Sequence, residues 1–245
     1  MIRAVIFFVA LVFSVQCHAG VWETVNKIKG NIANTHTSST STGSEPSKSE
    51  LIKGLKETLS VGVKRAVSKV SQKGGFYNNP LIRIPLPPNL RKAAYVMEKV
   101  GYGDKVRDFE LSMNRAAEEA AREALPIFVK AIKNITFDDA VKIWKGGNHA
   151  ATDYLREKTW NDLYKAFKPI VKKNMEKVDV TRKYQALTSS PYMKGVSSYA
   201  GVKPLDDYVT EKALEGLFKT LAQEEERIRK DPAARTTDLL KKLFR

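Results

Sequence analysis

Cysteine and histidine are nearly absent from this chain: among its 245 residues there are one cysteine, Cys17, and three histidines. Cys17 and His18 lie in an N-terminal segment that we expect to be removed, and His36 lies in a polar linker. The folded region is therefore left with His149 and no thiol. Disulfides, thiol nucleophiles and zinc sites with several histidine or cysteine ligands are excluded, and we expect neither a metal nor a cofactor.

Recognisable catalytic motifs are also missing. The sequence contains no glycine-rich phosphate loop, no Gly-x-Ser-x-Gly turn, no His-Glu-x-x-His pair and no acidic calcium loop. The Gly-Tyr-Gly string at residues 101–103 follows no predicted strand, so it indicates a helix end and not a nucleotide fingerprint. These absences favour a protein that is not an enzyme, and they provide no catalytic residue.

The N-terminus has the pattern of a secretory signal. Arg3 precedes an apolar run over residues 4–15, about 12 residues, which is too short for the roughly 20 that span a bilayer. Small residues at Cys17 and Ala19 predict cleavage after Ala19. A lipid anchor at Cys17 is the alternative, but Gln16 stands where a small residue is expected. The prediction is a periplasmic or secreted protein with no transmembrane segment after cleavage.

Positive charge is in large excess. The chain has 42 Lys and Arg against 27 Asp and Glu, a net charge of +15, and removal of Arg3 with the signal leaves 41 against 27, or +14. Nucleic acid is the usual partner of such a charge, but export makes it inaccessible. We expect an anionic lipid, lipopolysaccharide or an acidic protein instead. The alternative is that the charge only keeps the protein soluble.

The chain divides into three parts. Residues 1–19 are the predicted signal peptide. Residues 20–48 are a predicted flexible tether, because the stretch 34–47 has no apolar side chain to bury. Residues 49–245 form the predicted domain, which at about 195 residues is long enough for one hydrophobic core.

Apolar residues that recur every three or four positions predict an all-α domain, a single bundle of about six to eight helices. The two longest apolar stripes span residues 106–135 and 151–178. Each contains a proline, Pro126 or Pro169, which should kink the helix or restart it.

Capping residues predict where helices begin. Ser49 should start the first helix, which Gly74 and Gly75 end, and Asn89 should start a short one that Gly101 ends. Thr136 with Asp139 has the spacing typical of a capping box.

A segment rich in proline follows the first helix. Four prolines within residues 78–88 rule out a helix there and interrupt any β-ladder. We expect an extended strap that lies over the bundle, with Leu81, Ile82, Ile84 and Leu86 available to contact it.

The last predicted helix begins at Pro204. Two acid–base pairs spaced four residues apart, Glu225 with Arg229 and Glu226 with Lys230, are predicted on its exposed end.

The tail from residue 231 is predicted to be an architectural clasp, because its apolar side chains are too many to leave in water. Its Arg235 would fix the tail to the bundle if it were buried against acidic side chains, and would contact a partner if it were exposed. The alternative is a free amphipathic tail that contacts a membrane or a partner helix. The apolar residues concerned are Leu239, Leu240, Leu243 and Phe244.

Five segments of the sequence resemble a known family, and the likeness extends over residues 51–244. The strings that carry it are residues 79–87 (NPLIRIPLP), 111–118 (LSMNRAAE), 150–154 (AATDY), 208–214 (YVTEKAL) and 231–242 (DPAARTTDLLKK). They are similar to DUF4197, a family of unknown function. The resemblance implies an exported helical domain of bacterial origin. It implies no activity and no catalytic residue.

One polar cluster lies on the first long stripe, at Asn114, Arg115, Glu118, Glu119 and Arg122. Arg115 is three residues and Asn114 four residues before Glu118, so the three share a helix face. If buried, they could orient a carboxylate for general acid or base catalysis. The alternative is a structural polar clasp between helices.

A second polar set lies at the start of the second long stripe. It consists of His149, Thr152, Asp153, Tyr154, Arg156, Lys158 and Thr159. A helix N-terminus with hydroxyls and bases nearby can bind an anion. The alternative is that Asn148, Thr152 and Asp153 only form the cap and first turn of the helix.

The sequence as a whole favours a non-catalytic binding or scaffolding module that contacts an anionic envelope component. The candidate binding residues are Asn114, Arg115, Glu118, His149, Thr152, Tyr154, Arg156 and Arg235. Two alternatives remain. One is a hydrolase or lyase that uses Glu118, Arg115 and Asn114, and the other is a carrier of a hydrophobic molecule between the two helices that contain prolines.

Overall fold

The computed structural model describes residues 47–177, 203–235 and 241, and these residues form α-helices and 3-10 helices with no β-strand. The all-α prediction is therefore confirmed for this part of the chain. Residues Pro46–Arg245 form one compact unit. The predicted signal peptide, the alternative lipid anchor at Cys17 and nearly all of the predicted tether lie outside the described residues.

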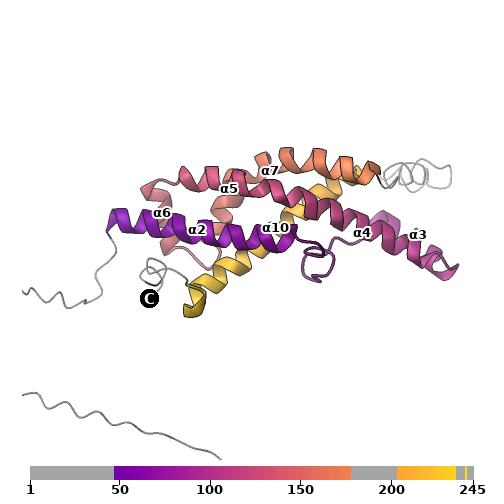
Figure 1. The fold of residues 1–245 in the computed structure, drawn as a ribbon, viewed down its shortest axis with the longest axis horizontal. Coiled ribbons are helices and arrows are strands. Elements are labelled where there is room, and N and C mark those ends of the chain that lie inside the picture. Colours follow the sequence, from indigo (N-terminus) through magenta and orange to yellow (C-terminus); the bar gives the residue numbers. More distant parts are fainter. Residues whose placement is uncertain (1–46, 178–202, 236–240, 242–245) are drawn as a thin grey trace, which may run out of the picture. The chain divides into compact units, whose positions relative to one another are not determined.

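The helices of this unit pack around a shared hydrophobic core (Figure 1). Helix α2 contacts α4, α5, α6 and α10, and α7 packs against α4, α5, α6 and α10. None of the helices in the described ranges is long and apolar enough to cross a bilayer. In chain order the elements are α2 (Lys48–Ser71), η1 (Pro88–Leu90), α3 (Arg91–Lys99), α4 (Gly103–Ala120), η2 (Ala121–Glu123), α5 (Ala124–Lys133), α6 (Phe137–Lys145), α7 (Ala150–Lys177), α10 (Leu205–Lys230) and η3 (Pro232–Ala234).

Helix α2 begins two residues before the predicted position. Ser47 is the N-cap and not Ser49, because Glu50 completes a capping box with it: the Ser47 hydroxyl accepts from the Glu50 N–H, and the Glu50 carboxylate accepts from the Ser47 N–H. The predicted apolar stripe is confirmed as the buried face, which is formed by Leu51, Leu55, Leu59, Val63, Val67 and Val70.

The strap lies against the bundle, as predicted, but through only part of the expected set. Ile82 and Ile84 are buried, whereas Leu81 is 55% exposed. Phe76, which lies before the predicted strap, is fully buried in the core. The prediction that Asn89 caps a helix was wrong, because Asn89 lies inside the η1 turn and α3 follows directly.

The proline of the first long stripe restarts the helix. Helix α4 ends at Ala120, the three residues of η2 follow, and Pro126 lies in the first turn of α5, where its missing N–H has no intrahelical role. The capping box of Thr136 with Asp139 starts α6, as predicted. Pro169 lies inside α7, which continues to Lys177.

The last helix has the predicted start, with Pro204 as its N-cap. At the other end, Arg235 is half-buried and donates to the carbonyl oxygens of Ile228 and Arg229 at 3.1 and 2.7 Å. Arg235 thus fixes the start of the tail to α10 through carbonyls and not through the acidic partners that we expected. The four apolar tail residues of the predicted clasp lie outside the described residues.

Substitution by alanine is expected to have opposite effects on stability at two buried helical glycines. A Cβ at Gly216 would lie 2.6 Å from the ring of Phe76, whereas a Cβ at Gly62 would lie 3.7 Å from Ile228, an ordinary contact. Gly216→Ala should therefore lower the free energy of unfolding, since overpacking costs about 1 to 3 kcal/mol. Gly62→Ala should raise it, because alanine is favoured over glycine in a helix by about 1 kcal/mol. Urea titration of both variants checks this, and equal effects would contradict it.

Candidate functional site

The Glu118 carboxylate of α4 holds the turn that follows α2. Its Oε1 accepts hydrogen bonds from the backbone N–H groups of Gly74, Phe76 and Tyr77 at 3.1, 3.2 and 3.4 Å. Arg115 donates to its Oε2. Glu118 is buried, and a buried carboxylate with four donors has its charge compensated. In this structure the side chain joins a helix to a loop.

Asn114 continues this attachment along the strap. Its Oδ1 accepts from the N–H of Ile84 at 2.8 Å, and its Nδ2 donates to the carbonyl of the same residue at 2.9 Å and to that of Glu110 at 2.8 Å. The amide therefore pairs with Ile84 as a neighbouring β-strand would, although the strap is not a strand. The structure brings together the predicted trio of Asn114, Arg115 and Glu118. Their polar side chains form hydrogen bonds with one another and with the backbone of this chain.

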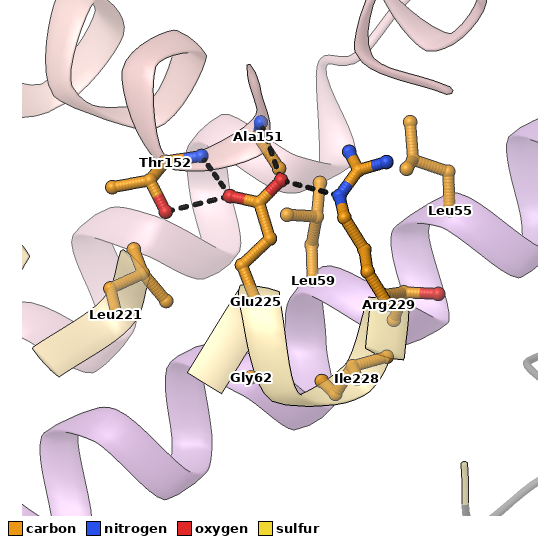
Figure 2. A pocket seen from close by; sticks show the side chains of 10 residues that line it. Leu55, Leu59, Gly62, Ala151, Thr152, Leu221, Glu225, Ile228 and Arg229 are labelled. Carbon is orange, nitrogen blue, oxygen red and sulfur yellow. Dashed lines mark hydrogen bonds and ion pairs between the residues drawn. The ribbon is translucent and has the colours of Figure 1, made fainter. Parts of the chain in front are cut away.

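A second carboxylate closes the N-terminus of α7 (Figure 2). Glu225 of α10 accepts from the N–H of Ala151 at 3.0 Å, and from the N–H and the hydroxyl of Thr152 at 2.8 Å each. These two N–H groups belong to the first turn of α7, where no preceding carbonyl is available. The anion that this helix end binds is thus a side chain of the same protein, and the α7 cap comes from α10.

Arg229 completes this cluster. Its Nε donates to Glu225 at 2.9 Å, and its guanidinium also donates to the carbonyl of Ile143 at the end of α6. The side chains of Glu225 and Arg229 are only 6% and 12% exposed. Beside them lies a mostly apolar cavity of about 20 Å³ between α2, α7 and α10 (Figure 2), which has room for about one water molecule.

The chain can now be assigned to a family. A family model described as "Protein of unknown function (DUF4197)" matches residues 45–245, which is most of the chain and contains both carboxylate clusters. The chain belongs to the DUF4197 family. Comparison with curated proteins and with solved structures finds no match. The family predicted from the sequence strings is confirmed.

The other predicted residues of this DUF4197 domain are dispersed. His149 is exposed at the turn before α7, and Arg156 is exposed seven residues further on, about two helical turns. The Arg156 guanidinium lies 4.9 Å from the ring centroid of Phe218 and 5.4 Å from that of Trp160, so it covers aromatic surface between α7 and α10. These residues do not converge with Thr152 on one binding site.

Tyr154 lines a cleft of about 370 Å³ between α5, α6 and α7. Its hydroxyl donates to Asp139 at 3.3 Å. Burial and the neighbouring Asp139 raise the pKa of Tyr154, so the phenol is neutral at pH 7. The cleft occupies the place predicted for a carrier's cavity, between the two helices that contain prolines, but Lys130, Lys158 and other polar side chains share its lining with apolar ones.

No group of three or more His, Cys, Asp or Glu that could hold a metal ion occurs among the described residues of the DUF4197 domain. The acidic side chains of the two clusters pair instead with backbone N–H groups and arginines.

The sequence did not lead us to Glu225, a buried carboxylate that accepts as many hydrogen bonds as Glu118. Glu225 was placed with Arg229 on an exposed helix end, yet it is buried. The signal was present: Glu225 lies four residues after Leu221 and three before Ile228, both of which belong to the apolar stripe of α10. A residue at this spacing shares the buried face. Glu226 and Lys230, one position away, form the exposed pair that was predicted.

An acid-sensitive link joins α7 to α10. Asp207 accepts from the Tyr164 hydroxyl and from the Lys168 ammonium, each at 2.5 Å. Partial burial alone would raise the pKa of Asp207, but these two hydrogen bonds outweigh it and hold the pKa below its usual value.

Asp207 therefore stabilises the fold above the pKa of an unfolded aspartate, about 3.9, and this stabilisation is lost as pH falls through the lower folded pKa. We expect the free energy of unfolding to fall less between pH 6 and pH 3 in Asp207→Asn than in the wild type. Asp206→Asn, a neighbour that accepts neither hydrogen bond, is the control. Equal pH dependence in the two variants would refute the assignment.

Proposed function

We propose that this protein is a non-catalytic binding module of the bacterial envelope, which attaches to an anionic component through its basic surface. The observation that carries the proposal is an asymmetry of burial. Glu118, Glu224 and Glu225 are buried, whereas no Lys or Arg in the described part of the chain is. The chain already has a net charge of +15. Because some of its carboxylates are buried, the charge exposed on the surface is more positive still.

Each of the three buried carboxylates has a structural role. Glu224 accepts from Lys69 at 2.9 Å and thereby joins α10 to α2. Glu118 holds the turn that follows α2, and Glu225 caps α7. The hydrolase or lyase alternative would require Glu118 to give up donors that compensate its buried charge. This favours a binding module over an enzyme.

The periplasm or the cell exterior is the proposed location, on the strength of the N-terminal signal pattern. Anionic lipids, lipopolysaccharide and acidic proteins are the polyanions available there, and attachment to them through exposed lysines requires no preformed pocket.

Co-sedimentation tests the proposal. The purified chain is mixed with lipopolysaccharide, with vesicles that contain phosphatidylglycerol, or with neutral phosphatidylcholine vesicles, from low to high salt. We expect association with at least one anionic component, weakening as ionic strength rises because exposed charges are screened within about 10 Å at 0.1 M salt. No association with any anionic component, or association that salt does not weaken, would contradict the proposal.

A further inference from the structure

Helix α3 exposes two of its three larger apolar side chains, and the third, Met97, is half-buried. Tyr95 and Val96 are 60% and 59% exposed, whereas Ala94 is buried. A surface helix of a folded domain normally does the opposite and buries the larger apolar residues. Among the described residues, α3 packs mainly against α4 and the η1 turn, and its outer face is left to the solvent.

The exposed apolar surface continues into the turn between α3 and α4. Val100 is 63% and Tyr102 is 57% exposed. Apart from Leu81 on the strap, the large exposed apolar side chains of the described residues all lie on α3 and this turn. We call the six residues Lys92, Tyr95, Val96, Lys99, Val100 and Tyr102 the α3–α4 tip. Figure 1 shows the two helices, α3 and α4, that this tip joins. Its apolar members lie within the eight residues 95–102, unlike the scattered apolar residues of an ordinary surface.

Lysines flank the apolar residues of the tip. Lys92 and Lys99 lie three residues before Tyr95 and three after Val96, a spacing that places all four on one face of the helix. The Lys99 ammonium lies 5.3 Å from the centroid of the Tyr95 ring. From Arg91 to Arg107 there are five basic and two acidic residues, a net charge of +3. The face therefore presents apolar and tyrosine side chains within a positive surrounding.

We infer that the α3–α4 tip docks on the surface of an anionic phospholipid bilayer. This inference rests on the proposed function and names the partner. Tyrosine favours the headgroup region because its ring is apolar and its hydroxyl polar. Valines at the same level reach the acyl boundary, and lysines extend their ammonium groups toward the phosphates. Each part of the tip thus meets a layer of the bilayer that suits its chemistry.

A second copy of this chain is a poorer occupant of the same face. A stable protein interface uses about 20 to 30 residues on each side, more than α3 and its following turn contain. Two copies would also bring their flanking lysines together. An anionic bilayer, by contrast, imposes no size requirement and attracts those lysines.

Residues 45–245 are the chain to test. The hydrophobic core of the described residues lies within residues 51–221, and Pro46–Arg245 is a compact unit of its own. Because Cys17 is the only cysteine, Val96→Cys can be labelled uniquely with a polarity-sensitive dye, and Leu81→Cys on the strap is a control of similar exposure. Circular dichroism confirms that both variants are folded.

We expect the dye at position 96, and not at position 81, to brighten and shift to the blue with phosphatidylglycerol vesicles but not with phosphatidylcholine vesicles. Equal responses at the two positions, or none at position 96, would overturn the inference. A response without vesicles that grows with protein concentration, together with a doubled mass, would also overturn it and assign the tip to a second copy.

Affinity measurements separate this inference from the proposed function. The pair Val96→Ser with Val100→Ser should weaken vesicle binding about tenfold, because the buried apolar area is lost. Lys92→Gln with Lys99→Gln should weaken it more than Lys165→Gln with Lys172→Gln on α7, which removes the same charge. If both lysine pairs weaken binding equally and the serine pair has no effect, binding through the basic surface is supported and docking through the α3–α4 tip is refuted.

Discussion

Glu225→Ala is expected to lower the free energy of unfolding by about 3 to 5 kcal/mol, the range observed when one partner of a buried ion pair is removed. The substitution leaves the guanidinium of Arg229 without its carboxylate at a position that is 12% exposed. It also removes the acceptor of the N–H groups of Ala151 and Thr152. Helices α7 and α10 meet at this carboxylate, and its partner Arg229 also donates to Ile143 of α6, so its loss should affect the whole bundle.

The adjacent residue is a matched control for this prediction. Glu226 has the same side chain and also pairs with a base four residues later, Lys230, but the pair is exposed. Glu226→Ala should therefore change stability little. Urea unfolding followed by far-ultraviolet circular dichroism measures both variants. If Glu226→Ala is as harmful as Glu225→Ala, the buried position of Glu225 is not the cause.

Glu118→Ala is expected to cost a similar amount, about 3 to 5 kcal/mol, because three backbone N–H groups and the Arg115 guanidinium lose their common acceptor. The loss should be felt first in the turn at residues 74–77, whose backbone is held by this carboxylate. Hydrogen exchange should show the amides of Gly74, Phe76 and Tyr77 exchanging faster, while the amides of α7 stay protected.

Two further variants make the Glu118 prediction specific. Glu119→Ala removes the neighbouring carboxylate, which is 47% exposed and pairs with Arg122, and should leave exchange in the turn unchanged. Glu118→Gln keeps an oxygen acceptor for the three N–H groups and should fall between the wild type and Glu118→Ala. Unchanged exchange in Glu118→Ala would show that the carboxylate does not hold the turn, and would return Glu118 to the enzyme alternative.

Local patterns predicted most of the helices correctly. The apolar stripe of α2, the restart of the helix near Pro126 and the capping box of Thr136 with Asp139 depend on residues within four positions of one another. Interactions of this range are set by backbone geometry and hydrogen-bond periodicity. The errors at helix ends were small: Ser47 and not Ser49 caps α2, because the partner carboxylate is Glu50.

The predicted polar trio on α4 was a correct grouping whose partners were not foreseeable. Spacing placed Asn114, Arg115 and Glu118 on one face, and the structure brings them together. That their partners are the backbone of the turn at residues 74–77 and of Ile84 depends on where the strap lies. The sequence does not indicate which backbone N–H groups these side chains bind, because every residue except proline has one.

The amino-acid sequence alone was enough to predict an all-α domain of the DUF4197 family with an excess of positive charge. Helix periodicity and capping depend on residues that are close in sequence, and the net charge is a count over the chain. Folding then decided which charges are buried. Glu225 and Glu226 are chemically identical neighbours, yet one caps α7 beneath the surface and the other is exposed. The apolar stripe of α10 already distinguishes their positions on the helix, but only the packing of α10 against α2 and α7 supplies the backbone N–H groups that Glu225 accepts from, because those contacts join segments distant in sequence. The same contacts leave Tyr95 and Val96 exposed, although their side chains alone would place them inside.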